Sequence, residues 1–491
     1  VINPPAENNV IPDVQVDWVG SLKNAAVVIS RLHKGEKRLV FVDSRSKVEE
    51  LAVELRCLGV ATYISHSSLS LEERRAAEEA FSQGNDCVIV STSTLELGID
   101  VGDLDRVIQI DAPYTVASFL QRIGRTGRRS GSSRNCLFLA TKEDAFLRAL
   151  ALLQLWRKGY VEPIEPPARP MHIYAQQTMA LALQQKGIIA ADVDQWVGRM
   201  PGFAGVTPDD RAGVISYMLG AGILHSDEGL IGIGKAGERA FGEKNFMELF
   251  SVFTTPPMVK VFWGKQELGE VHQLTFAVRD NGPALLTLGG RSWQTTYIDW
   301  PRKKAFVEPS EVRGKSQWVS DAQPLRYELC RAIADVLISD LVPDGISSRA
   351  QGLLADLRDQ YGWMESGRST LIFDADGNAV WWNFAGKLLN SAMKDLLADE
   401  ADKLIADNEC MTFRHVYSAE ALVRAIREIL AGDAHNLAVL LDEAFVQELK
   451  FAECLSQKEI DRELGERYSV DSDFKQFSRI SLAVLWVKEE A

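Results

Sequence analysis

The sequence is poor in cysteine and has no long run of apolar residues. Its 491 residues include six scattered cysteines, none of which lies in a Cys-x-x-Cys pair or beside a pair of histidines. We therefore expect no disulfide framework, no zinc site and no other metal centre. No apolar run reaches the length that spans a bilayer, and no secretory signal is visible at the start. These absences predict a cytoplasmic protein without membrane contact.

The sequence also lacks a glycine-rich loop for cradling nucleotide phosphates. The pattern Gly-x-x-x-x-Gly-Lys-Ser/Thr ends in a hydroxyl that reaches a metal ion. The nearest match runs from Gly229 to Lys235, but Ala236 follows it. The acidic pair Asp442-Glu443, which could otherwise hold magnesium, lies in a helical and acidic region far along the chain. A nucleoside triphosphate would therefore need binding groups from elsewhere.

The last third of the chain has an excess of acidic residues over basic ones. The formal net charge is −14, and residues 331–491 carry about −12 of it. Residues 1–330 are close to neutral, so they can still present a basic groove to phosphate groups. The acidic last third is better suited to a protein partner than to a nucleic acid.

A chain of this length is too long for one core and predicts several domains. In residues 1–165, short apolar runs alternate with segments of helical periodicity. This alternation predicts a doubly wound parallel sheet, whose ligands bind beyond the carboxyl ends of the strands. The expected strands are 39–42, 61–64, 86–90 and 106–110, and the expected helices between them include 48–58 and 71–81.

Two stretches of this domain stand out. Gln121-Arg-Ile-Gly-Arg-Thr-Gly-Arg-Arg129 places four arginines within eight positions, spaced by glycines. Guanidinium groups suit anionic oxygens because they stay charged and present a fixed fork of donors. About twenty residues earlier lies Val90-Ser-Thr-Ser-Thr-Leu-Glu-Leu-Gly-Ile-Asp100. Taken in isolation, the arginines would equally suit a solvated basic helix face.

Together the two stretches resemble motifs V and VI of superfamily 2 helicases. Ser93-Thr-Leu-Glu-Leu-Gly-Ile-Asp100 is similar to the Lhr (large helicase-related) branch of that superfamily. Phe41-Val-Asp-Ser-Arg45 resembles motif IV, and His66-Ser-Ser-Leu-Ser70 resembles the motif that follows it. The resemblance implies that residues 1–165 are the second RecA-like domain of a helicase motor.

The resemblance also implies roles for single residues. Arg125 and Arg128 match arginine fingers, which stabilise charge on the phosphoryl group being transferred. The residues that match nucleotide-binding positions are Gly98, Asp100 and Gln121. The residues that match contacts to the nucleic-acid backbone are Ser44, Arg45, Ser68 and Thr92. The same residue types would also serve as helix caps and local ion pairs, and Arg122 is expected to brace the domain internally.

The rest of the chain divides into three expected segments. Prolines between 163 and 170 mark a boundary. Residues 166–248 resemble the Lhr winged helix, and residues 249–322 alternate apolar and polar residues as in a small antiparallel β-barrel. The resemblance implies that Trp293 of this barrel stacks on a base, although barrel tryptophans are also common core residues. Residues 323–491 are expected to form a mostly helical α+β C-terminal domain. Within it we expect a hairpin of the strands 370–373 and 379–382, with helices dominating from there to about residue 467.

The resemblance implies an ATP-dependent helicase or translocase that moves 3′ to 5′ on single-stranded nucleic acid, with DNA as the expected strand and RNA as the alternative. ATP and Mg²⁺ would be bound mainly by a first RecA-like domain, supplied upstream in the same chain or by a partner chain. The 491 residues alone are then expected to be inactive. A rival interpretation is a non-enzymatic module that binds nucleic acid or a protein partner in a repair or defence complex.

Overall fold

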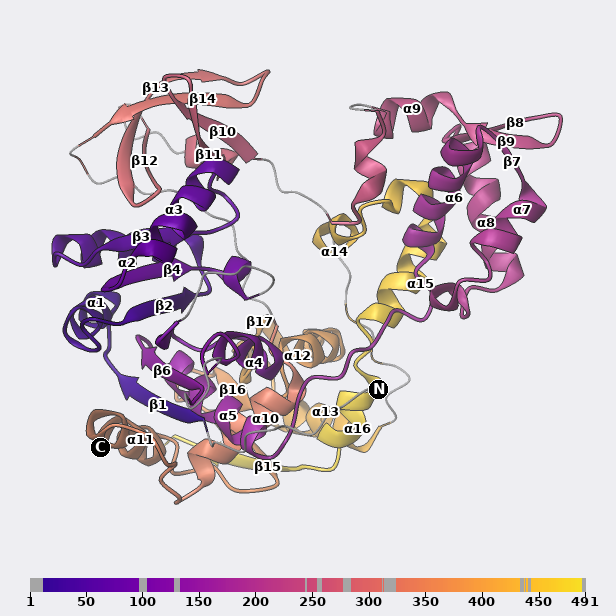
Figure 1. Ribbon diagram of the computed structural model, residues 1–491. Coiled ribbons are helices and arrows are strands. Elements are labelled where there is room, and N and C mark those ends of the chain that lie inside the picture. The colour runs from indigo at the N-terminus through magenta and orange to yellow at the C-terminus, as the bar shows by residue number, and fades with distance from the viewer. Residues whose placement is uncertain are drawn as a thin grey trace. The chain divides into compact units, whose positions relative to one another are not determined.

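The computed structural model describes residues 12–96, 104–127, 133–242, 245–253, 258–276, 284–310, 312, 324–432, 437, 439 and 443–487. Its contacts divide the chain into two compact units, and each unit is discontinuous in sequence. Unit 1 joins residues 1–162 with 256–366, and unit 2 joins residues 163–255 with 367–491. Figure 1 labels many elements of both units.

Unit 1 contains a six-stranded sheet in the order β1-β6-β5-β2-β4-β3. All of its pairings are parallel, which confirms the parallel α/β sheet expected from the sequence. The strands are β1 (Asp13–Trp18), β2 (Lys37–Val42), β3 (Thr62–Ser65), β4 (Cys87–Ser91), β5 (Arg106–Ile110) and β6 (Asn135–Ala140). The connecting helices are α1 (Leu22–Arg31), α2 (Arg45–Cys57), α3 (Leu71–Gln83), α4 (Val116–Ile123) and α5 (Glu143–Arg157).

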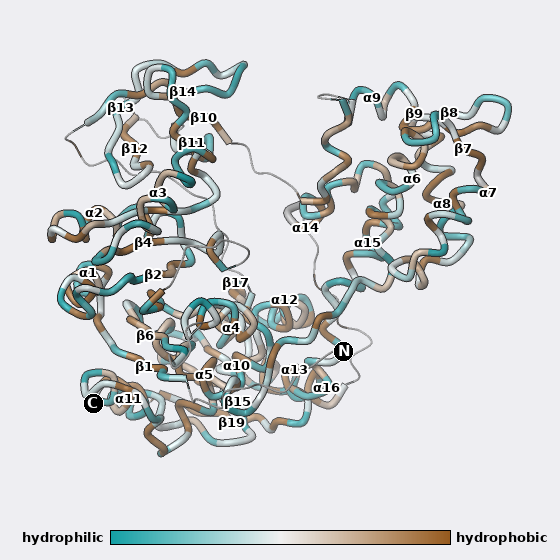
Figure 2. Tube along the Cα trace, viewed as in Figure 1, coloured by the Kyte–Doolittle hydropathy of each residue, from teal (hydrophilic) through white to brown (hydrophobic). Residues whose placement is uncertain are grey.

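The central strands of this sheet are buried almost throughout. β2 is buried from Arg38 to Val42, and every residue of β4 is buried. Near-continuous apolar runs of this kind are typical of parallel strands covered on both faces. Figure 2 shows hydrophobic residues along β2 and α5. Arg38 of β2 and Gln109 of β5 are buried polar exceptions within these strands.

A second sheet of unit 1 has five strands in the order β11-β10-β14-β13-β12. Its pairings are antiparallel except for β10 with β14, which is parallel. Among the described residues, β11 and β12 are its edge strands. The strands are β10 (Met258–Trp263), β11 (Gln266–His272), β12 (Leu285–Leu288), β13 (Arg291–Asp299) and β14 (Lys304–Pro309).

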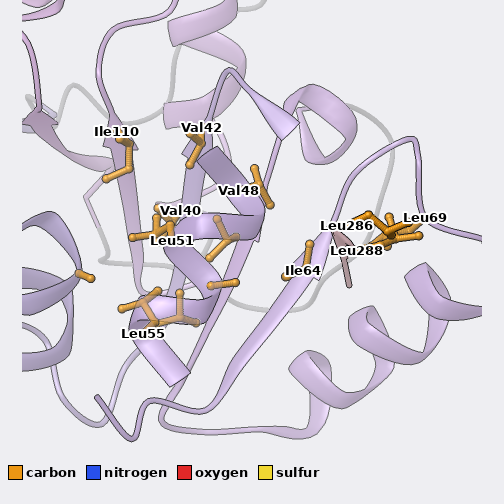
Figure 3. Packing of buried hydrophobic residues seen from close by; sticks show 14 of the residues in the cluster. Val40, Val42, Val48, Leu51, Leu55, Ile64, Leu69, Ile110, Leu286 and Leu288 are labelled. Carbon is orange, nitrogen blue, oxygen red and sulfur yellow. The ribbon is translucent and has the colours of Figure 1, made fainter. Parts of the chain in front are cut away.

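The two sheets of unit 1 share one hydrophobic core. Figure 3 shows Leu69, which follows β3, beside Leu286 and Leu288 of β12. The same cluster contains Val40 of β2 and Val261 of β10. Contiguous burial of this kind makes the two sheets one packed body.

A buried carboxylate fixes the β12–β13 turn to helix α2. Glu49 accepts a hydrogen bond from the backbone N–H of Gly289 at 2.8 Å and another from the N–H of Gly290. Its third partner is His66, whose Nε2 lies 2.8 Å from the carboxylate. Arg56 donates to the carbonyls of both glycines, at 3.1 and 2.8 Å. Both glycines have positive φ, as a two-residue hairpin turn requires, and a Cβ on Gly290 would collide with the Arg56 guanidinium.

Two further helices belong to unit 1 although they follow the second sheet in sequence. α10 (Tyr327–Ile338) packs on α5, and α11 (Ser348–Gln360) packs on β1. Between them, residues 345–347 hydrogen-bond to Val16 of β1, at 2.8 and 3.0 Å. The backbone edge of β1 is therefore partly covered by the chain itself.

The first part of unit 2 is a helical cluster with a small three-stranded sheet in the order β7-β9-β8. Its core also includes residues from 449–464, so a late segment of the chain completes it. The early elements are α6 (Met171–Gln185), β7 (Ile188–Ile189), α7 (Ala190–Trp196), α8 (Pro208–Gly220), β8 (Leu224–Asp227), β9 (Leu230–Ile233) and α9 (Lys235–Phe241). The late elements are α14 (Glu443–Glu448) and α15 (Gln457–Arg467).

The second part of unit 2 is built on a five-stranded sheet in the order β17-β18-β16-β15-β19. The hairpin of β15 (Arg368–Phe373) and β16 (Ala379–Trp382) was expected from the sequence. The expectation of helices across the following residues was wrong at β17 (Ala401–Ala406) and β18 (Cys410–Val416). The two strands pair antiparallel, and β18 buries the alternate residues Met411 and Phe413. The remaining elements are α12 (Lys387–Lys394), α13 (Ala419–Ala431), α16 (Asp471–Phe477) and β19 (Ser481–Trp486).

None of the helices in the described ranges combines the length and the hydrophobicity that crossing a bilayer requires.

Ion pairs attach α15 to the first part of unit 2. Arg462 donates to both carboxylate oxygens of Asp210 at 2.8 Å, and the buried pair His172–Glu463 joins α6 to the same helix. Burial alone would raise the pKa of Asp210, but hydrogen bonds from Arg462 and Thr207 hold it below its ordinary value. The charged form of Asp210 is therefore the one that stabilises this contact.

We expect Asp210→Asn to lower the stability of unit 2 by about 1 kcal/mol at neutral pH, because the bidentate ion pair is lost. A carboxyl group whose pKa is depressed on folding stabilises the protein above its unfolded pKa of about 4 and loses that effect as pH falls through the folded value. The difference between the wild type and Asp210→Asn should therefore shrink below about pH 4. Thermal unfolding followed by circular dichroism, with exposed Asp209→Asn as the matched control, measures it. Equal behaviour of the two variants at pH 7 would contradict this expectation.

Candidate nucleic-acid interface

Three neighbouring strands of the first sheet end beside one hollow. In the register of the sheet, Phe41 of β2 pairs with Ser91 of β4, and Val42 pairs with Ile110 of β5. The residues that follow these strands therefore lie at the same edge. They line a hollow of about 600 Å³, which we call the strand-end hollow. Its polar lining includes Asp43, Ser44, Lys47, Thr92, Ser93, Glu96, Asp111, Thr115, Ser118, Arg122 and Arg148.

Ser44 and Thr92 both line the strand-end hollow. Each precedes a helical segment, α2 for Ser44 and the short 3₁₀ helix Ser93–Leu95 for Thr92. Neither side chain makes the hydrogen bond that would cap its helix. Two hydroxyl-bearing residues from adjacent strand ends thus line one hollow, where hydroxyls can donate to phosphate oxygens without reading bases.

Arg122 of α4 forms the centre of a buried network. Its guanidinium donates to Glu96 at 2.7 Å, to Gln109 at 2.6 Å and to Asp43 at 2.6 Å, and it lies over the ring of Phe41. Its side chain is only 5% exposed. The expected internal brace is therefore present, and it joins the ends of three strands.

Glu96 is the acceptor that the sequence reasoning missed. Its carboxylate binds Arg122 and also accepts a hydrogen bond from Ser118 at 2.9 Å. A glutamate between Leu95 and Leu97 is a polar residue within an apolar run, and that was the signal for a buried partner.

Arg125 follows α4 and is largely buried, with 8% of its surface exposed. Its guanidinium donates a hydrogen bond to the backbone carbonyl of Glu96. It is not among the described residues that line the strand-end hollow. Gln121, on the same helix, is exposed. The expected site residues Gly98, Asp100 and Arg128 lie outside the described residues.

Two other cations of the strand-end hollow were not identified from the sequence. Lys47 pairs with Asp111 at 2.5 Å, and Asp111 also accepts from the backbone N–H of Thr141 at 2.8 Å. Arg148 of α5 lies over the ring of Tyr114. Both cations reach the hollow from helices. Their local sequence does not distinguish them from cations on a solvent-exposed helix face.

Arg45 and Ser68 lie beside the second sheet. The carbonyl of Ser68 accepts a hydrogen bond from the N–H of Glu270 in β11 at 2.6 Å, and the Ser68 side chain is buried. Burial lowers the pKa of the Arg45 guanidinium, and the nearby Glu270 carboxylate acts in the opposite direction. The structure therefore places these two residues at the junction of the sheets, and neither lines the strand-end hollow.

Trp293 is a core residue of unit 1. It is 3% exposed, and its indole N–H donates to the carbonyl of Leu288 at 2.8 Å. Its ring packs on Trp263, with the centroids 5.5 Å apart. Inward placement follows from its position in β13, where Thr295 is also buried. The indole has its hydrogen-bond partner within the protein.

No cluster of three or more candidate metal ligands occurs in the part of the chain that the structure describes.

Comparison with known proteins gives one family and several relatives. Residues 22–130 match the helicase conserved C-terminal domain. The Lhr helicase/uracil glycosylase of Escherichia coli is 27% identical over 350 residues, which are 62% of this chain and 22% of that protein. The ATP-dependent helicase Lhr-Core of Methanocaldococcus jannaschii is 28% identical over 317 residues, 62% of this chain and 37% of that protein.

Among solved structures, the fold is similar to that of Mycobacterium smegmatis helicase Lhr bound to ssDNA and AMP-PNP. The TM-score is 0.68 at 18% identity, covering 99% of this chain and 71% of that one. The chain spans about a fifth to two fifths of the length of the two curated relatives. With the parallel sheet and the strand-end hollow in place, these comparisons show that residues 22–130 match the helicase conserved C-terminal domain and that the chain is similar to the C-terminal part of the core of Lhr-type superfamily 2 helicases.

Proposed function

We propose that this chain is the second half of an ATP-dependent motor that moves along single-stranded DNA in the 3′ to 5′ direction. The observation that carries the proposal is the strand-end hollow, which is lined by Ser44 and Thr92 together with the arginine network of Arg122. Such a site holds a sugar-phosphate backbone without regard to sequence, which a translocating motor needs. The single strand and the nucleotide analogue in the Mycobacterium smegmatis Lhr structure support this assignment.

ATP and Mg²⁺ would be held mainly by a first RecA-like domain, in the same polypeptide or in a partner chain. This chain would contribute Arg125 and Arg128 as arginine fingers, with Gln121, Gly98 and Asp100 near the nucleotide. In the structure, Arg125 donates to the carbonyl of Glu96. We infer that it exchanges this backbone acceptor for a phosphate oxygen when the two motor halves close on ATP.

The remaining segments would guide the strand. We propose that α6 to α9 with the β8–β9 hairpin form a winged helix, and that the second sheet of unit 1 is the barrel of the Lhr core. The acidic last third is proposed to meet a protein partner.

A second candidate function is a module that binds nucleic acid or a protein partner without turnover, in repair or defence. The burial of Arg125 favours this second candidate, because its guanidinium already donates to the carbonyl of Glu96 and would have to leave that carbonyl to reach a phosphate. Under this alternative the strand-end hollow still binds a strand, but no ATP is hydrolysed.

We expect the purified 491-residue chain to hydrolyse ATP no faster than the background, because the sequence has no phosphate-cradling loop. Phosphate release measured with and without single-stranded DNA tests this. Turnover that rises with the concentration of the chain would contradict the half-motor proposal.

Joining the chain to a first RecA-like domain should restore ATP turnover, and Arg125→Ala should then lower it by about a thousandfold or more. Strand binding should change little, because Arg125 does not line the strand-end hollow. Exposed Arg75 of α3 provides the control Arg75→Ala, for which full turnover is expected. Unaltered hydrolysis in Arg125→Ala would favour the non-enzymatic module.

Ser44→Ala and Thr92→Val should each weaken binding of single-stranded DNA by about twofold to tenfold, the effect of one lost hydrogen bond. Fluorescence anisotropy of a labelled oligonucleotide measures the affinity. Ser46→Ala is a matched control, because Ser46 lies two residues after Ser44 and does not line the hollow. If the three variants bind alike, the hollow is not the binding track.

A further inference from the structure

The second sheet of unit 1 has one buried face and one face that points away from the core. In β10, Val259 and Val261 are buried, and in β14, Ala305 and Val307 are buried. These four side chains belong to the core shared with the first sheet. Because side chains alternate along a strand, the residues between them lie on the opposite face.

Three aromatic rings form a row across that opposite face. Phe262 of β10 pairs with Phe306 of β14, and Phe306 pairs with Tyr297 of β13. The ring centroids of Phe262 and Phe306 are 5.8 Å apart, and those of Phe306 and Tyr297 are 6.1 Å apart with an interplanar angle of 25°. We call these residues the aromatic row; β10, β14 and β13 lie side by side in Figure 1.

A β-bulge places Tyr297 in the row. Before the bulge, Trp293 and Thr295 point inward and are buried. The register shifts between Thr295 and Tyr297, so that Thr295 pairs with Val307 but Tyr297 pairs with Phe306. Without the extra residue, Tyr297 would follow Thr295 into the core. The bulge therefore directs an aromatic ring outward, where it gains no burial: Tyr297 is 61% exposed.

A cationic group lies against the aromatic row. The ammonium group of Lys304 lies 5.3 Å from the centroid of the Phe262 ring. Lys304 begins β14 directly after the exposed residues Arg302 and Lys303. Part of the local positive charge is neutralised, since Arg302 lies 3.2 Å from Asp299. Lys303 and Lys304 therefore supply most of the charge that could meet phosphates.

We propose that the aromatic row is a stacking platform for two or three unpaired bases of a single-stranded nucleic acid, with Lys303 and Lys304 contacting the adjacent phosphates. Sheets that bind single strands use exposed aromatic rings in this way, because every base has a face that can stack. Aromatic rings also occur at protein–protein interfaces, but lysines are depleted there, so the lysines beside these rings match phosphate groups better than a protein partner. The proposal rests on the proposed single-strand function, and it adds a second contact outside the strand-end hollow.

The platform is held rigidly on the motor domain. Glu49 and Arg56 of α2 clamp the β12–β13 turn, and both sheets share one core. Bases stacked on the row would therefore move together with the backbone held at Ser44 and Thr92.

The test uses the full 491-residue chain and a fluorescein-labelled oligothymidylate of about 20 nucleotides, long enough for both sites. Tyr297→Ala is expected to weaken binding by about tenfold, the effect of one lost stacking contact. Tyr297→Phe keeps the ring and should bind like the wild type. Tyr417→Ala removes an aromatic ring of similar exposure from unit 2 and should also bind like the wild type. A blunt duplex should bind all four proteins alike, because its bases cannot stack on protein.

Photo-crosslinking of the same oligonucleotide carrying 5-iodouracil gives a second readout, which does not depend on the stability of a variant. Crosslinked peptides should contain Tyr297 or Phe306. Three results together would overturn the platform alone: Tyr297→Ala binds with full affinity, no crosslink forms at Tyr297 or Phe306, and Ser44→Ala still weakens binding. Equal losses on strand and duplex would also overturn it, as would a change in self-association without a change in strand affinity. Failure of the wild-type chain to bind any single strand would overturn the proposed function as well.

Discussion

The buried guanidinium of Arg122 is the interaction on which the candidate interface depends. It makes hydrogen bonds to Asp43 after β2, to Gln109 in β5 and to Glu96 after β4. Burying a charge is costly unless it is paired and hydrogen-bonded. The three acceptors together therefore offset the cost of removing the Arg122 guanidinium from water. The network therefore fixes the relative positions of three strand ends, and the hollow beside them has a defined shape because of it.

A second constraint acts between the two sheets of unit 1. The carboxylate of Glu49 accepts from two consecutive N–H groups of a glycine turn, and Arg56 donates to the carbonyls of the same turn. Both the N–H groups and the carbonyl groups of the turn are thus hydrogen-bonded to α2. Together with the shared core, this makes the second sheet an extension of the motor domain rather than a separately moving part.

The sequence was sufficient for elements with a strong local pattern. The parallel strands β2, β4 and β5 were expected at nearly their observed positions, because buried apolar runs with polar ends identify them. β1 and β6 were not expected, and β17 and β18 were expected to be helical. In β18, the buried residues Met411 and Phe413 alternate with polar ones, but the alternation is short and lies between helices. Whether such a short segment pairs as a strand is decided by its tertiary contacts.

The candidate site shows the same division between local and tertiary information. Motif resemblance led to Ser44 and Thr92, which do line one hollow, and to Arg122 as a brace. It could not indicate whether a side chain is buried, because burial depends on what packs against it. Ser68 and Trp293 are covered by contacts within unit 1 that no local pattern reveals. The aromatic row was missed for a related reason, since it exists only when three strands align in register.

Both compact units are discontinuous, and this has a consequence for synthesis. The sheet of residues 13–140 emerges from the ribosome first, but the strands that share its core begin only at Met258. Unit 2 begins to emerge in the interval and needs α15, at residues 457–467, to complete its own core. Neither unit can therefore finish folding before segments of the other have been made. Shortened versions of the protein that end between these segments would leave apolar faces exposed, so useful boundaries have to follow the two units rather than the order of the chain.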